Sequence, residues 1–182
     1  MYAVRFHGRG GQGAKTASRI LGTAAFLSGY QAQDSPIYGA ERRGAPVAAF
    51  TRFGREPIRE RGVIAHPDLV VVADASLLED PAARVSDGIT DQTILFVNSP
   101  LHAEQIRTQS GLPGRITTFG VTEIALQHFG QREAISALLG AVAARLSGLQ
   151  QEPLRQALAR ELEDLGVAPP IIERNQTVAL TC

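Results

Sequence analysis

The segment that most constrains the fold is the start of the chain, where a strand pattern runs through a cluster of glycines into a helical pattern. Residues 3–7 read as a strand, and glycines follow at positions 8, 10, 11 and 13. An apolar stripe at helical spacing then occupies residues 13–28, and Gly29 sits where a C′ glycine ends a helix. Such a turn directs backbone N–H groups and a helix N-terminus at an anion. We therefore expect a phosphate-bearing molecule to dock at this end.

The rest of the chain alternates strand-like and helix-like segments. Further strands are predicted at residues 31–34, 47–52, 67–74, 93–98 and 115–119, and helices at residues 134–147 and 152–165. Continuous β-branched runs such as residues 67–74 are typical of buried parallel strands. Gly166 is expected to close the last helix, and Pro169-Pro170 to begin an extended tail.

This alternation predicts an α/β fold, a Rossmann-like open and mostly parallel sheet with helices on both faces and a helical C-terminal part. No linker or repeat divides the sequence, so we expect a single domain over residues 1–182.

Composition excludes several classes of function. Lys+Arg 18 balance Asp+Glu 18, so no net field attracts nucleic acid. No apolar run is long enough for a membrane span, and Met1 leads into a strand without a signal peptide. The one cysteine, Cys182, cannot form a disulfide within the chain, a zinc site or an iron–sulfur cluster. We expect a cytoplasmic protein with no metal site and no catalytic residue of its own.

The spacing Gly8-x-Gly10-x-x-Gly13 fits the dinucleotide-binding fingerprint in its strand–turn–helix context. A tight turn without a ligand is the plainer alternative. An NAD site also needs an acidic residue at the end of the second strand, and Asp34 lies near there, although Ser35-Pro36 makes it an equally good turn former. The fingerprint indicates a phosphate rather than a nicotinamide. A stand-alone NAD(P)-binding Rossmann dehydrogenase domain stays the alternative function.

A second loop, Tyr38-Gly39-Ala40-Glu41-Arg42-Arg43-Gly44-Ala45-Pro46, follows the glycine loop at a defined spacing. Together with Gly10-Gly11-Gln12-Gly13 it resembles the gamma subunit of 2-oxoacid:ferredoxin oxidoreductases of the pyruvate and ketoisovalerate type. Residues 57–59, 67–78 and 95–99 extend the resemblance over almost the whole chain.

The resemblance implies one subunit of a complex that oxidatively decarboxylates a 2-oxoacid to acyl-CoA and CO2. Electrons would pass to ferredoxin or to an NAD-reducing subunit. Thiamine diphosphate, Mg²⁺ and 4Fe–4S clusters would lie in partner subunits of the alpha, beta and delta type. This chain would bind coenzyme A, contribute subunit contacts and not be catalytic alone. The 2-oxoacid stays open between pyruvate, a branched-chain acid, 2-oxoglutarate and an aryl glyoxylate.

By the resemblance, the glycine loop would lie against the nucleotide and phosphate portion of coenzyme A, through Gly10, Gly11, Gln12 and Gly13. We infer that Arg9 adds a charge-assisted contact. Asn98 ends a central strand at the carboxyl edge, where open α/β sheets bind ligands, or else caps the following turn.

The second loop is predicted to pack beside the active site or at a subunit interface, because glycines bracket its charged run and arginine tolerates such burial. A solvated charged turn is the alternative. The residues concerned are Tyr38, Gly39, Ala40, Glu41, Arg42, Arg43 and Gly44.

Overall fold

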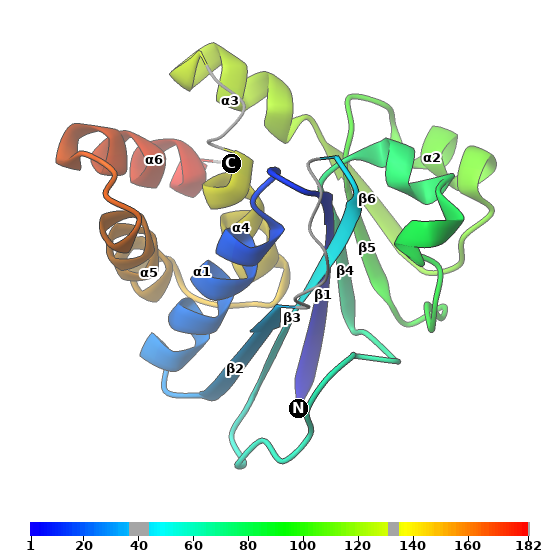
Figure 1. The fold of residues 1–182 in the computed structure, drawn as a ribbon, viewed down its shortest axis with the longest axis horizontal. Coiled ribbons are helices and arrows are strands. Elements are labelled where there is room, and N and C mark those ends of the chain that lie inside the picture. Colours follow the sequence, from blue (N-terminus) through cyan, green and yellow to red (C-terminus); the bar gives the residue numbers. More distant parts are fainter. Residues whose placement is uncertain (37–43, 131–134, 182) are drawn as a thin grey trace.

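The computed structural model describes residues 1–36, 44–130 and 135–181, and in them one mixed sheet runs in the order β2-β3-β1-β4-β5-β6 (Figure 1). β3 is antiparallel to both of its neighbours, and the other neighbouring pairs are parallel. The predicted mostly parallel α/β sheet is confirmed. The strands are β1 (Tyr2–Arg9), β2 (Gln31–Pro36), β3 (Pro46–Gly54), β4 (Leu69–Val72), β5 (Ile94–Asn98) and β6 (Arg115–Phe119).

Helices lie on both faces of the sheet, but unevenly. α1 and α4 pack directly on one face, and α5 and α6 form a further layer beside them (Figure 1). On the opposite face, α2 packs against β6, and short 3-10 helices follow β4. The helices are α1 (Ala14–Leu27), α2 (Ala103–Ser110), α3 (Val121–Phe129), α4 (Ile135–Leu146), α5 (Gln151–Asp164) and α6 (Pro169–Thr181), with 3-10 helices η1 (Ala75–Leu78) and η2 (Pro81–Ala83).

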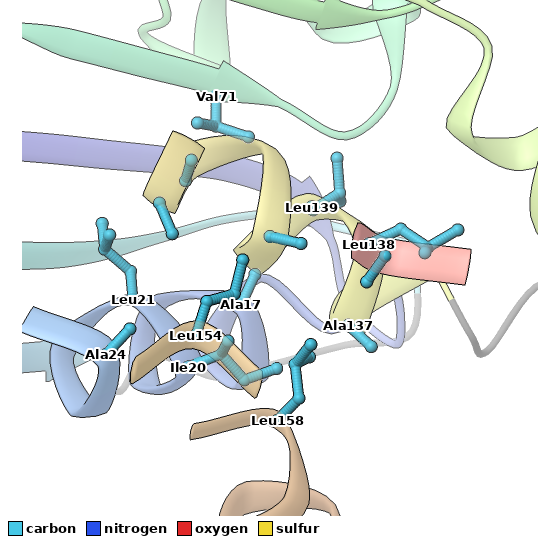
Figure 2. Packing of buried hydrophobic residues seen from close by; sticks show 14 of the residues in the cluster. Ala17, Ile20, Leu21, Ala24, Val71, Ala137, Leu138, Leu139, Leu154 and Leu158 are labelled. Atoms are coloured by element: carbon cyan, nitrogen blue, oxygen red, sulfur yellow. The ribbon is translucent and has the colours of Figure 1, made fainter. Parts of the chain in front are cut away.

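The apolar stripe of α1 explains why this helix lies at the centre of the larger core. Ala17, Ile20, Leu21 and Ala24 are fully buried among side chains of α4, α5 and β4 (Figure 2). Leu27, at the end of the predicted stripe, remains 37% exposed. Burial of the Ile20 and Leu21 side chains stabilises the fold by about 1.5–3 kcal/mol each, and the packed stripe fixes the glycine loop at the N-terminus of the helix.

The C-terminal segment differs from the sequence-based expectation. Residues 169–181 form helix α6, so the predicted extended tail is wrong. Pro169 and Pro170 occupy the first turn, where a missing N–H breaks no helical hydrogen bond. Ile172 and Val178 are buried in the core shared with α4 and α5.

Smaller differences concern element bounds. β2 continues to Pro36, beyond the predicted end at Asp34, because it pairs with β3 as far as Ala49. The short helices α2 and α3 follow β5 and β6 and were not singled out by the sequence pattern. No helix in the described part of the chain has the length and apolarity to cross a membrane.

Candidate functional site

The glycine loop joins β1 to α1 in a backbone conformation that requires glycine. Gly11 has φ 95° and Gly13, the N-cap of α1, has φ 75°. A Cβ on Gly13 would also collide with the Cβ of Ser136 at the start of α4. α1 carries no acidic residue in its first turn, so the positive end of its dipole is not offset there by the helix itself.

Gln12 fixes the loop through both ends of its side-chain amide. Its Oε1 accepts a hydrogen bond from the Arg9 backbone N–H at 2.7 Å, and its Nε2 donates to Asp74 Oδ2 at 3.0 Å. The side chain therefore links the carboxyl end of β1 to the segment that follows β4.

Asp74 is a site residue for which the sequence analysis proposed no role. Its Oδ1 accepts from the Ser76 backbone N–H at 3.0 Å and from Ser76 Oγ at 2.7 Å, which caps η1. Burial opposes ionisation, but hydrogen bonds from Ser76 and Gln12 and the charge of Arg9 together lower the pKa of Asp74. Its position directly after the β-branched run is the signal that would have identified it.

Arg9 is engaged by neighbouring parts of the chain. Its Nη2 donates to Ser76 Oγ at 2.8 Å, and its Nη1 donates to the Gly44 carbonyl at 3.2 Å. The carboxylates of Asp74 and Asp80 each lie 3.6 Å from the guanidinium. Arg9 thus ties the glycine loop to the start of β3 and to the turns after β4.

Asn98, at the end of β5, links two other elements of the site. Its Nδ2 donates to the Ala73 carbonyl at 2.9 Å and to Thr122 Oγ1 at 2.8 Å, while its Oδ1 accepts from the Thr122 N–H at 3.2 Å. The side chain therefore caps the first turn of α3 rather than the turn that follows it in sequence.

A pocket of about 290 Å³ opens where these elements meet, at the carboxyl ends of β1, β4 and β5. Three of the predicted coenzyme A contacts line it: Gly11, Gln12 and Asn98. The other three, Gly10, Gly13 and Arg9, lie in the same loop but are not among its lining residues. The sequence analysis did not propose the remaining lining side chains, chiefly Asp74, Ser99, Thr122 and Glu123.

The second predicted loop is seen only at its end. Gly44 donates its N–H to the Gly10 carbonyl at 3.3 Å, and the Gly10 N–H donates to the Ala45 carbonyl at 2.8 Å. The two loops are therefore adjacent at this point. Tyr38, Gly39, Ala40, Glu41, Arg42 and Arg43 lie outside the described residues, so their predicted role is untested.

The electrostatics of the pocket favour hydrogen bonding over ion pairing. Asp74 and Glu123 contribute carboxylates to its lining, and no lysine or arginine is among the described residues that line it. An anionic group would therefore be held by backbone N–H groups near the N-terminus of α1, whereas the carboxylates would accept hydrogen bonds from hydroxyl or amide donors.

Comparison with known proteins identifies relatives of the whole chain. The family model described as "Pyruvate ferredoxin/flavodoxin oxidoreductase" matches residues 3–181. A Pyrococcus furiosus protein named "Pyruvate/ketoisovalerate oxidoreductases common subunit gamma" is 44% identical over 159 residues, covering 87% of this chain and 85% of that protein.

Two solved structures share the fold. The crystal structure of the pyruvate oxidoreductase subunit PORC from Thermotoga maritima has a TM-score of 0.81 at 33% identity and covers 98% of this chain and 92% of that one. The 2-oxoglutarate:ferredoxin oxidoreductase from Magnetococcus marinus, solved with 2-oxoglutarate, coenzyme A and succinyl-CoA bound, has a TM-score of 0.75 at 14% identity. It is matched over 99% of this chain and 30% of its own. That second likeness concerns the fold alone.

Proposed function

The chain belongs to the pyruvate ferredoxin/flavodoxin oxidoreductase family as the gamma subunit of a 2-oxoacid:ferredoxin oxidoreductase, and from this we propose that its own part in the reaction is to hold coenzyme A. The complex would oxidise a 2-oxoacid, transfer the acyl group to the thiol of coenzyme A, release CO2 and pass the electrons to ferredoxin. The names of the relatives favour pyruvate or a branched-chain 2-oxoacid as the substrate.

One observation carries the proposal. Gly11 and Gln12 of the glycine loop line the same pocket as Asn98, which comes from a strand more than eighty residues later in the sequence. Open α/β sheets bind nucleotides at this edge, where a change in strand order leaves a crevice. In this sheet the chain leaves β1 and returns in β2, on one side of β1. The next parallel strand, β4, lies on the other side of β1, so the strand order changes direction there.

Different residues of the pocket would bind different parts of coenzyme A. The bare backbone at Gly11 lets a ligand approach closely, and nearby N–H groups would donate to phosphate oxygens. Asp74, held ionised by its partners, would accept a hydrogen bond from a ribose hydroxyl or an amide N–H. These contacts would anchor the nucleotide so that the thiol can reach a reacting group in a neighbouring subunit.

The remaining chemistry is assigned to partner subunits. A 4Fe–4S cluster takes four cysteine thiolates, and this chain has one cysteine, so a cluster does not fit it. Groups of three or more His, Cys, Asp or Glu side chains that could hold a metal ion are not found among the described residues. Thiamine diphosphate, its Mg²⁺ and the clusters would be carried by alpha, beta and delta-type subunits. We place the complex in the cytoplasm, where coenzyme A and ferredoxin are available.

The alternative of a stand-alone NAD(P)-dependent dehydrogenase is not supported. β3 lies between β1 and β2, so the strand that carries Asp34 is not the direct neighbour of the glycine-loop strand. The Asp34 Cβ lies 3.7 Å from where a Cβ on Gly22 of α1 would lie. Gly22 is two and a half helical turns beyond the N-terminus of α1, roughly 13 Å from the loop. Asp34 is therefore badly placed to hold a ribose at the loop.

The test compares two variants of the chain, Gly11→Leu and the control Gly29→Leu. Both glycines have positive φ, 95° and 85°, and a Cβ on either meets no other atom within 4 Å. The strain of each change is thus similar, about 1–3 kcal/mol, but only Gly11 lines the pocket. In the assembled complex we expect Gly11→Leu to raise the KM for coenzyme A about tenfold or more, with little change in the KM for the 2-oxoacid.

Gly29→Leu should leave both constants unchanged. Equal KM values for coenzyme A in the two assembled variants would show that the loop does not bind this substrate.

A further inference from the structure

A second and larger cavity lies on the face of the sheet that α1 and α4 leave bare. It has a volume of about 620 Å³. Its floor consists of residues 45–48 and Phe50 of the β3 segment together with Arg5 and His7 of β1. Its two walls are residues 63–66 and residues 82–84, 87 and 88. We call this cavity the β1–β3 groove.

The groove is held open by contacts within the chain. Arg5 reaches both walls, because its Nη1 donates to the Ile64 carbonyl at 3.3 Å and its Nη2 donates to the Val85 carbonyl at 2.7 Å. The walls also touch at one end, since a Cβ on Gly88 would collide with the Ala65 carbonyl oxygen. A groove fixed in this way needs little reordering before a partner binds, which lowers the entropic cost of association.

The floor of the groove carries a buried positive charge. Arg5 is 3% exposed and has no carboxylate within ion-pair distance among the described residues. At the rim, Arg84 and Asp87 neutralise one another through an ion pair of 2.6 Å. Burial lowers the pKa of Arg5 from its usual value, and the charge of Asp87 opposes this shift only in part. The groove is thus apolar with one incompletely neutralised cation, which an acidic group on its occupant would complement.

The rim indicates an occupant that is larger than a small molecule. Val63, on one wall of the groove, is 63% exposed, so a large apolar side chain stands open at the rim. In the described part of the chain α2 covers the sheet at β6, whereas over β1 and β3 this side carries the short 3-10 helix η2 and no α-helix. An exposed apolar side chain at the rim of a preformed, largely apolar cavity fits a protein–protein contact. The groove also begins at Ala45, directly after the loop that the sequence suggests as a subunit contact.

We propose that the β1–β3 groove takes a segment of another subunit of the oxidoreductase complex, in which apolar side chains flank an aspartate or glutamate. The proposal rests on membership in this family of multi-subunit enzymes and does not depend on coenzyme A binding at the other pocket.

The first experiment compares Val63→Asp with Phe26→Asp in the co-expressed complex. Both residues are 63% exposed, but Phe26 lies on α1, on the other face of the sheet. A carboxylate on the rim would face apolar side chains of the partner and repel the partner's own acidic residue, so we expect Val63→Asp to reduce the recovered complex about tenfold. Phe26→Asp should assemble as the unmodified chain does. Thermal unfolding of the two isolated variants checks that both fold.

The second experiment places a photo-activated crosslinking residue at position 63 of the chain in the intact complex. We expect crosslinks to a partner-subunit peptide that contains an acidic residue flanked by apolar ones. Normal assembly of Val63→Asp overturns the proposal, as do crosslinks confined to a second copy of this chain. Crosslinks to a small molecule alone overturn it as well.

Discussion

Arg5 and His7 lie two residues apart on the same face of β1, and both are buried although each carries an ionisable group. Arg5 offsets its burial by donating to two backbone carbonyls. Burial and the neighbouring charge of Arg5 lower the pKa of His7 to about 3, although a hydrogen bond to the Ala83 carbonyl opposes this shift. Within the described residues, His7 Nε2 has no hydrogen-bond partner. His7 is therefore a neutral imidazole at physiological pH.

This neutral histidine makes the stability of the chain depend on pH. The pKa of the His7 imidazole is 6.5 in the unfolded chain and about 3 in the folded chain. The stability that this group contributes is therefore fully present above pH 6.5 and is lost as the pH falls towards 3. Between pH 7.5 and pH 5 this one group should remove about 2 kcal/mol from the free energy of unfolding. Over the same pH interval, the free energy of unfolding of the His7→Gln variant should fall by about 2 kcal/mol less than that of the unmodified chain. Urea unfolding at both pH values measures this difference.

His128→Gln serves as the control, because this side chain is exposed at the end of α3. It tests whether the effect belongs to the buried histidine. If His7→Gln shows the same pH dependence as His128→Gln, burial does not lower the pKa of His7 in the folded protein.

Much of the site at residue scale was predictable, because its signals are local. The glycines of the first turn and the polar residue after a buried strand appear in the sequence itself. The partners of Arg9 were not predictable, since Asp74, Ser76 and Asp80 are more than sixty residues away and nothing local selects them. Long-range pairing therefore engages Arg9 within the chain, and its contact with the ligand stays a prediction.

At the scale of elements, the close approach of α1 and α4 sets the position of the glycine loop. A Cβ on Gly140 would lie 2.9 Å from the Cβ of Ile20 and 3.2 Å from the Ala17 carbonyl oxygen. Glycine at position 140 thus lets the two helix backbones come together.

Replacing Gly140 by alanine should therefore destabilise the chain, although alanine normally favours a helix. The overlap with Ile20 should outweigh the gain in helix propensity and lower the free energy of unfolding by about 1–2 kcal/mol. Gly22→Ala in α1 is the matched control, because its nearest contacts would be ordinary ones at 3.7 Å. That change should stabilise by up to about 1 kcal/mol. Equal effects in urea unfolding would contradict a tight contact at position 140.

α6 shows where element prediction from the sequence reaches its limit. The two prolines were interpreted as the start of an extended segment, whereas they fit the first turn of a helix equally well. The apolar residues that follow are spaced for one buried face, and that signal was available. α2 was harder to predict, since Ile106 is the buried residue of that helix and gives no stripe.

At the scale of the whole molecule, the order of the strands decides which surfaces are available for binding. The sequence predicts the strands and their mostly parallel character, but the insertion of β3 between β1 and β2 depends on pairing between distant segments. That insertion separates Asp34 from the glycine loop, and it also creates the face on which the β1–β3 groove lies.

Hydrogen exchange should distinguish the two binding surfaces in one experiment. Coenzyme A added to the isolated chain should slow exchange at residues 10–14 and 121–123, which border the smaller pocket, and leave residues 62–66 unchanged. Assembly with the partner subunits should slow exchange at residues 63–66 and at residues 82–84, 87 and 88, the walls of the groove. Protection of the groove walls by coenzyme A alone would contradict the assignment of two separate surfaces.

The two outermost strands have a consequence for the subunit before it is assembled. β2 is built of Gln, Ala, Asp and Ser residues and ends at Pro36, which has no N–H to offer, while β6 begins with the exposed Arg115. Polar, charged or proline-containing edges discourage other chains from adding strands to a sheet. Neither edge of an unassembled copy is thus a good template for added strands, and the β1–β3 groove lies on a sheet face, which offers no strand edge to extend.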